Sequence, residues 1–282
     1  MNESEFATLP ATAAREALRI EYRWIGADGA DRADGAISAD APLAVFLHEG
    51  LGSIAMWKDW PAVLCARLGM RGLVYSRPGY GRSTPREHSV KWPVDFMAQQ
   101  ARDVLPALLD ALGVDAAERK RMWLIGHSDG ASIALLHAAA FPEALAGAVA
   151  IAPHVFVEDI SVESIAAAKV AYETTGLREK LARYHDDVDS AFYGWNDIWL
   201  DPAFRAWNIV GELGAIRAPL LAMQAFDDHY GTMAQVEAIG AAVPHAHVHA
   251  LAQGGHSPHR DAPGPLDAAI EQFVSAQRKP GA

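Results

Sequence analysis

Short apolar runs alternate with helical patterns along most of this chain, and the runs end in glycine, proline or polar residues. The apolar runs lie at 18–26, 42–50, 71–83 with its loop, 121–126, 145–153, 219–228 and 245–255. Helical patterns occupy 56–69, 95–114, 129–140 and 264–277. Strands that alternate with helices form mostly parallel sheets, which need helices on both faces. The sequence therefore predicts an α/β protein with a mostly parallel sheet of about eight strands.

The alternation is interrupted once, between about 154 and 215, where helix-like pieces rich in aromatic residues replace the expected strand. This spacing predicts a helical lid (154–215) inserted into a core domain made of 1–153 and 216–282. Such a lid would cover the carboxyl ends of the strands, where open α/β sheets bind ligands. Packing inside the lid explains any single aromatic residue, but as a set some should line a pocket. We expect Phe156, Trp195 and Trp199 to do so.

The charge balance limits the classes of partner. The net charge is −11 and the isoelectric point is near 5.5, which argues against nucleic acid or anionic membranes as partners. The sequence has no run of about 18 apolar residues and no apolar signal region at its N-terminus. A small-molecule substrate and a cytoplasmic monomer or homodimer are the expectations. The single cysteine, Cys65, lies in an amphipathic pattern and is expected in the core.

A serine stands between two glycines where a buried strand meets a helix, in the stretch Gly126-His127-Ser128-Asp129-Gly130. This G-x-S-x-G pattern forces a sharp turn that presents the serine outward, beside the amides at a helix N-terminus. A serine hydroxyl is a poor nucleophile at neutral pH and needs a neighbouring base. The pattern therefore predicts a nucleophilic serine with partners elsewhere in the chain.

At this point the chain resembles the α/β-hydrolase superfamily over nearly its whole length. The motifs that carry the resemblance are FLHEGLGS (46–53), SRPGYGRS (76–83), GHSDG (126–130), AFDDHYG (225–231) and GGHSPH (254–259). They follow the chain order nucleophile, acid, histidine. The resemblance implies a triad of Ser128, an aspartate after the strand at 219–228, and His256, with His259 as a supporting hydrogen-bonding residue.

Two aspartates compete for the acid position. The family pattern is G-x-x-D counted from the strand end, and Ala225 takes the place of that glycine. This count favours Asp228 and leaves Asp227 as the alternative. The acid would hold the tautomer of the imidazole and stabilise the imidazolium without taking its proton.

The resemblance also implies an oxyanion hole of two backbone N–H groups. One donor is Asp129, which follows the nucleophile. The other lies in the loop after the first parallel strand, at Gly50 with Leu51 as the alternative, because Glu49 replaces the usual glycine after His48.

Two acids, Glu49 and Asp129, fall beside the predicted nucleophile. An acid in the first turn of a helix is explained by the helix dipole alone. The alternative is that both acids line the pocket and favour a neutral or cationic substrate over one with an extra carboxylate.

The histidines of HAHVH (245–249) alternate, so they share one face of a strand. A His-x-His pattern can bind metal, but no carboxylate or cysteine cluster joins it in sequence. A solvent-facing strand is the preferred interpretation, and neither a metal nor a cofactor is expected.

The preferred function is a serine hydrolase that cleaves a modest carboxylic ester through an acyl-enzyme. Alternatives are hydrolysis of carbon–carbon bonds in diketone-like ring-cleavage products, and hydrolysis of amides or N-terminal proline peptides. A non-enzymatic receptor on the same fold is a further alternative. Dehalogenases and epoxide hydrolases of this superfamily carry an aspartate where Ser128 stands, which argues against those activities.

Overall fold

Eight strands form one sheet in the computed structural model, which describes residues 4–13, 15–26, 37–38 and 40–278. The strand order across the sheet is β1-β2-β4-β3-β5-β6-β7-β8. The strands are β1 (Glu5–Leu9), β2 (Leu18–Ile25), β3 (Leu43–Leu47), β4 (Arg71–Tyr75), β5 (Trp123–His127), β6 (Gly147–Ile151), β7 (Leu220–Ala225) and β8 (His247–Leu251). Along this order the pairings from β4 to β8 are all parallel, whereas β1 pairs with β2, and β2 with β4, in the antiparallel direction. The predicted mostly parallel sheet is confirmed.

The first strand of the sheet is the one that the apolar pattern does not reveal. β1 pairs with β2 at the edge, and within it Ala7 and Leu9 are buried whereas Glu5 and Thr8 are exposed. A short strand that includes these two polar residues gives no continuous apolar run. An edge strand needs none, because its side chains are less fully covered than those of a central strand.

Helices cover both faces of the sheet, and β3 shows how the sequence divides between them. Leu43, Val45 and Leu47 belong to one apolar core, while Ala44 and Phe46 belong to the other. The alternation follows from the two-residue period of a strand, and full burial on both faces explains why β3 is apolar throughout. The first core includes α3 (Leu105–Ala111) and α5 (Asp129–Ala140), and the second includes α1 (Trp60–Leu68) and α12 (Pro263–Gln277).

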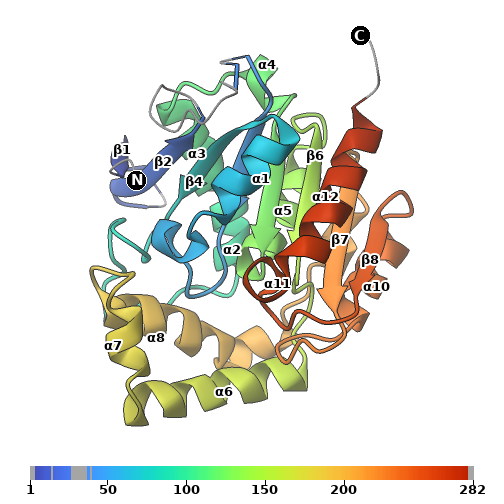
Figure 1. Ribbon diagram of the computed structural model, residues 1–282. Helices are drawn as coiled ribbons and strands as arrows, with labels where there is room; N and C mark the ends of the chain where they lie inside the picture. The colour runs from blue at the N-terminus through green and yellow to red at the C-terminus, as the bar shows by residue number, and fades with distance from the viewer. Residues whose placement is uncertain (1–3, 14, 27–36, 39, 279–282) are drawn as a thin grey trace.

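Further helical segments lie outside the stretch between β6 and β7. They are η1 (Ile54–Trp57), α2 (Phe96–Gln99), a π-helical turn η2 (Gln100–Val104), α4 (Ala116–Arg119), α10 (Ala234–Ala242) and α11 (Pro258–Asp261). The long pattern predicted at 95–114 is thus a helix with a π-helical turn in its middle, α2-η2-α3. Figure 1 shows α1 and α12 in front of the sheet.

Between β6 and β7 the chain forms only helical segments and one isolated bridge. These are α6 (Asp159–Thr174), α7 (Leu177–Leu181), α8 (Val188–Trp199), the 3₁₀ helix η3 (Pro202–Ala206) and α9 (Val210–Leu213). An antiparallel bridge between Phe156 and Asn208 joins the two ends of this segment. Figure 1 shows α6, α7 and α8 gathered below the sheet, at the end where β7 points. The helices occur where the lid was predicted, and the division into two domains stays a prediction.

Candidate active site

Ser128 lies at the turn between β5 and α5, in a backbone conformation that is rare for a residue with a side chain. Its φ is 53° and its ψ is −122°, a strained region that persists only where the surrounding structure holds it. The following helix packs closely on the sheet at Gly130, where an added Cβ would lie 2.0 Å from the carbonyl oxygen of Leu47. The G-x-S-x-G pattern therefore reflects close packing around an outward-turned serine.

The hydroxyl of Ser128 meets the imidazole of His256, and His256 meets Asp228. Ser128 Oγ is 2.9 Å from His256 Nε2, and His256 Nδ1 is 2.8 Å from Asp228 Oδ2 and 3.1 Å from Oδ1. A carboxylate only accepts, so Nδ1 carries the ring proton and Nε2 accepts from the serine hydroxyl. The structure thus brings together three residues that lie at the carboxyl ends of three strands.

The two aspartates of the acid loop have different partners. Asp228 Oδ1 accepts from the backbone N–H of Tyr230 at 2.7 Å, and Oδ2 accepts from Gln224 Nε2 at 2.8 Å. Asp227 instead accepts from the backbone N–H groups of Gly254 and Gly255, at 3.3 and 2.9 Å. Asp228 therefore orients the imidazole, while Asp227 holds the turn that precedes it.

Burial and hydrogen bonding set the charges of this cluster. Burial alone would raise the pKa of Asp228, but the hydrogen bond and charge of His256 lower it to about 2. Burial lowers the pKa of His256 below its ordinary value, although Asp228 acts in the opposite direction. At neutral pH the aspartate is ionised and the histidine is neutral, which is the state of a general base.

A single carbonyl group, that of Glu49, holds the loop after β3 in place. The carbonyl oxygen of Glu49 accepts from His48 Nδ1 at 2.7 Å, Arg77 Nη2 at 2.8 Å and the N–H of Gly52 at 3.0 Å. In a trans peptide the C=O and the following N–H point in opposite directions. Fixing the Glu49 carbonyl toward Arg77 therefore directs the N–H of Gly50 the other way. Gly50, Leu51 and Asp129 all line the same cavity as Ser128.

A second histidine ties the loops around the site together. His127 is fully buried, its Nε2–H donates to the carbonyl oxygen of His256 at 2.6 Å, and its Nδ1 lies 3.4 Å from Glu49 Oε2. It joins the β3 loop, the β5 turn and the loop that carries His256. Its position inside the G-x-S-x-G motif gave no sign of this connection.

The prediction that His259 would provide a supporting hydrogen bond is wrong. Its ring packs among aromatic side chains, with centroid distances of 5.0 Å to Trp57 and 4.7 Å to His127. Its Nδ1 is buried without a hydrogen-bond partner. The same ring lies 5.3 Å from the ring of Trp60 in α1, measured between centroids.

A cavity of about 340 Å³ opens at Ser128. Three of the four predicted pocket residues line it, namely Glu49, Trp195 and Trp199. The fourth, Phe156, is not among the lining residues. Its backbone pairs with Asn208, and its N–H lies 3.4 Å from Gln235 Oε1, so the side chain packs against the apolar core instead.

Other lining residues were not predicted. They include Met56, His154, Ile165, Leu181, His229, Tyr230, Ser257, Arg260 and Asp261. His154 directly follows the run predicted at 145–153. Its position at a strand end could therefore have identified it as a candidate lining residue. Tyr230 and Arg260 come from loops whose direction no local pattern fixes.

The remaining sequence features have no role at this cavity. Cys65 is buried in the core, as expected. His245, His247 and His249 are all exposed. Among the residues that the structure describes, no group of three or more possible metal ligands occurs. No helix in that part of the chain is both long and apolar enough to cross a bilayer.

Comparisons with known proteins agree on the type of fold. The sequence model of the Alpha/beta hydrolase family matches residues 44–269. A protein of Variovorax paradoxus (strain S110), named "Putative carbamate hydrolase RutD", is 29% identical over 243 residues, covering 76% of this chain and 85% of that protein. Two solved structures superpose over nearly all of the chain. A structure titled for carboxylesterases of Nitrososphaera gargenis has a TM-score of 0.74 at 17% identity, with 97% and 98% of the two chains covered. The proline iminopeptidase of Mycobacterium smegmatis has a TM-score of 0.73 at 17% identity, with 98% of each chain covered.

Proposed function

Because the chain belongs to the alpha/beta hydrolase family, we propose that it is a serine hydrolase that cleaves a small carboxylic ester or a related acyl compound. One observation carries the proposal. His256 bridges Ser128 Oγ at 2.9 Å and Asp228 Oδ2 at 2.8 Å, beside a cavity large enough for a small substrate. Nucleophile, base and orienting acid in contact are the arrangement that acyl transfer to serine requires.

The first half of the reaction forms an acyl-enzyme. His256 Nε2 takes the hydroxyl proton of Ser128 as Oγ attacks the acyl carbonyl carbon, and the carbonyl oxygen becomes an oxyanion. The resulting imidazolium then gives its proton to the leaving oxygen as the bond from carbon to that oxygen breaks, so the alcohol departs neutral. Asp228 stays ionised and keeps Nδ1–H directed at itself throughout.

The oxyanion is bound by the N–H groups of Asp129 and Gly50. Asp129 is the first residue of α5, so its N–H has no acceptor within the helix. The anchored carbonyl of Glu49 favours Gly50 over Leu51 as the second donor. Each donor of this kind is typically worth about 3 kcal/mol in the transition state.

The second half restores the enzyme. A water molecule gives one proton to His256 Nε2, and its oxygen attacks the acyl carbon. The bond to Ser128 Oγ then breaks, the proton returns to that oxygen, and the carboxylic acid leaves. Ser257, Arg260 and Asp261 line the same cavity, so part of its wall consists of polar residues.

Carbamates and amides belong among the compounds to test. The relative from Variovorax paradoxus is named a carbamate hydrolase, and the same triad chemistry applies to a carbamate carbonyl. Carbon–carbon bond hydrolysis and a receptor without turnover are the other outcomes that a substrate panel separates.

The experiment measures turnover of p-nitrophenyl esters, thioesters, lactones, carbamates, amides and a diketone by three proteins, namely the wild type, Ser128→Ala and Ser89→Ala. Ser89 is exposed and is not among the residues that line the cavity, so it is a matched serine control. We expect ester turnover that falls about 10⁴-fold or more in Ser128→Ala and stays close to that of the wild type in Ser89→Ala. Turnover that survives in Ser128→Ala would contradict the proposal.

A further inference from the structure

We propose that the acyl substrate carries a protonated amine close to its reacting carbonyl, and that the carboxylate of Asp129 binds this amine. The inference rests on the proposed function and adds the chemical class of the substrate. It starts from Asp129, a lining acid with one buried carboxylate oxygen that has no hydrogen-bond partner.

Asp129 is only 1% exposed, yet Oδ2 makes no hydrogen bond. Its other oxygen, Oδ1, accepts from the indole N–H of Trp199 at 3.2 Å. A buried carboxylate oxygen without a donor is costly, so such an oxygen calls for a donor from elsewhere. The cavity that Asp129 lines is where a substrate can supply that donor.

The nearest cation does not satisfy this oxygen. Arg77 Nη2 is 3.8 Å from Oδ2, beyond hydrogen-bond distance, and it donates to the carbonyl of Glu49 at 2.8 Å instead. Arg77 forms a buried ion pair with Oδ2 at this distance, but it is not among the residues that line the cavity. Burial raises the pKa of Asp129 to about 6 against the lowering effects of Arg77 and Trp199. A cation bound beside this carboxyl group would favour its ionised form.

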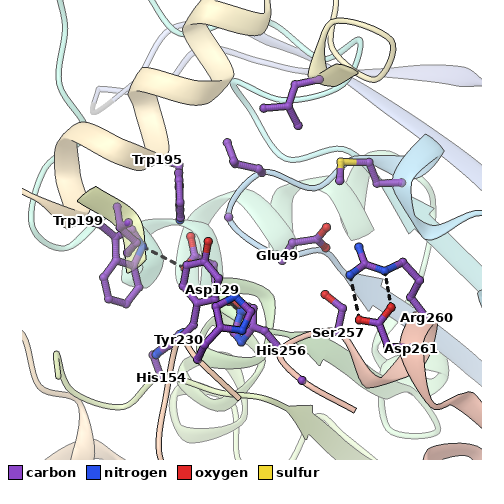
Figure 2. A pocket seen from close by; sticks show the side chains of 18 residues that line it. Glu49, Asp129, His154, Trp195, Trp199, Tyr230, His256, Ser257, Arg260 and Asp261 are labelled. Carbon is purple, nitrogen blue, oxygen red and sulfur yellow. Dashed lines mark hydrogen bonds and ion pairs between the residues drawn. The ribbon is translucent and has the colours of Figure 1, made fainter. Parts of the chain in front are cut away.

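The charges that face the cavity favour a cation. Three carboxylic acids line the cavity, Glu49, Asp129 and Asp261, whereas Arg260 is the only arginine or lysine among its lining residues. Arg260 and Asp261 pair with each other through two contacts of 2.9 Å. Figure 2 shows this pair on the opposite side of the cavity from Asp129, with Glu49 between them. Glu49 and Asp129 are thus left without a lining cation to neutralise them.

Aromatic rings complete a site suited to an ammonium group. Trp195, Trp199 and Tyr230 line the same cavity, and Figure 2 shows Trp195 and Trp199 beside the Asp129 carboxylate. The faces of such rings attract cations. Acids and aromatic rings together bind an ammonium group better than a neutral or anionic one.

The backbone of Asp129 fixes where on the substrate the amine must lie. The same residue provides an oxyanion N–H and the unpartnered Oδ2, so the two groups are only a few bonds apart. An amine on the α or β carbon of the acyl chain is likewise only a few bonds from the carbonyl group that this N–H would bind. The geometry points to an α- or β-amino acyl compound.

Binding to the Ser128→Ala protein tests this inference without requiring turnover. Four ethyl esters of similar length differ at one end of the acyl chain. They are ethyl β-alaninate (ammonium), ethyl butanoate (methyl), ethyl β-hydroxypropanoate (a neutral donor) and monoethyl succinate (carboxylate). Dissociation constants are measured by calorimetry near pH 7 on Ser128→Ala, Ser128→Ala/Asp129→Asn and the charge-matched control Ser128→Ala/Glu237→Gln. Glu237 is exposed on α10, away from the cavity.

We expect the ammonium ester to bind about 10- to 100-fold more tightly than the methyl ester, as a hydrogen bond to a charged group implies. This ratio should fall at least several-fold with Asp129→Asn and stay unchanged with Glu237→Gln. Equal binding of the ammonium and methyl esters, or tighter binding of the carboxylate ester, would overturn the inference even if Asp129→Asn does not fold. Equal binding of the hydroxyl and ammonium esters would also overturn it. Turnover of the same esters by the wild-type protein tests the proposed function separately, since binding selectivity does not depend on it.

Discussion

Replacing Asp228 by asparagine should prevent His256 from acting as a base while the fold is kept, because the backbone N–H of Tyr230 determines which way the new amide group points. The N–H of Tyr230 donates to Oδ1 at 2.7 Å and requires an acceptor there. An asparagine would therefore place its oxygen at that position and its NH₂ group at the Oδ2 position, 2.8 Å from His256 Nδ1. Gln224 Oε1 has no hydrogen-bond partner, so rotation of its amide would let it accept from the new NH₂ group, at the cost of the hydrogen bond from Gln224 Nε2 to the carbonyl oxygen of Gly231.

The consequence is the wrong tautomer of His256. An NH₂ group facing Nδ1 forces that nitrogen to accept, so the ring proton moves to Nε2 and points at Ser128 Oγ. The base is then blocked although each side chain stays in place. We expect kcat to fall about 10⁴-fold, which corresponds to about 5 kcal/mol of transition-state stabilisation.

The assay is the kcat of p-nitrophenyl ester hydrolysis by the wild type, Asp228→Asn and Asp227→Asn. The last variant is the matched control, because it loses the same charge from the neighbouring residue. The amide oxygen that Asp227→Asn introduces can still accept from the N–H of Gly255, so we expect the kcat of this variant to stay within about tenfold of the wild type. An Asp228→Asn enzyme within tenfold of the wild type would refute the reasoning, and so would a large loss confined to Asp227→Asn.

Two further predictions concern the base and the loop after β3. Because burial lowers the pKa of His256, its neutral form persists to lower pH, and the acid limb of kcat/KM for a neutral ester should have its midpoint below about 6.5; a midpoint above that value in a pH profile would contradict this. At Gly50, an added Cβ would lie 2.2 Å from Cδ1 of Trp195, so Gly50→Ala must displace either the ring or the oxyanion loop. We expect it to lower kcat at least about tenfold in the wild type but less in a Trp195→Ala background, and equal losses in the two backgrounds would show that the contact does not matter.

The resemblance to the α/β-hydrolase superfamily implied that Ser128, Asp228 and His256 would meet, and the physical reason is that each of them follows a strand of the sheet. Parallel strands bring their carboxyl ends to one edge of the sheet, so residues far apart in the chain meet there without any long-range information. The choice of Asp228 over Asp227 rested on the family pattern G-x-x-D, counted from Ala225 in the place of the glycine. In the structure Asp228 contacts His256, and Asp227 contacts the turn before it.

The contacts between loops could not be predicted in the same way. His127 joins three loops through its ring nitrogens, and the direction of a ring depends on the packing of all its neighbours. Phe156 failed as a pocket residue for the same reason, because its aromatic character says nothing about the backbone bridge that turns it away. Whether a buried polar atom has a hydrogen-bond partner also depends on the three-dimensional packing, and Asp129 Oδ2 is an atom that has none.

The strand β1 was missed for a different physical reason. An edge strand buries fewer residues than a central one, so its sequence carries a weaker apolar signal. The other strands of the sheet have long apolar or alternating runs, whereas β1 is recognised by its pairing with β2.

The most direct test of the account is to identify the residue that a fluorophosphonate modifies, by mass spectrometry of the intact protein and its peptides. The account predicts a single adduct on Ser128 that forms much more slowly in His256→Ala and does not form in Ser128→Ala. An adduct on another residue, or a Ser128 that reacts equally fast without His256, would contradict the claim that His256 activates this serine.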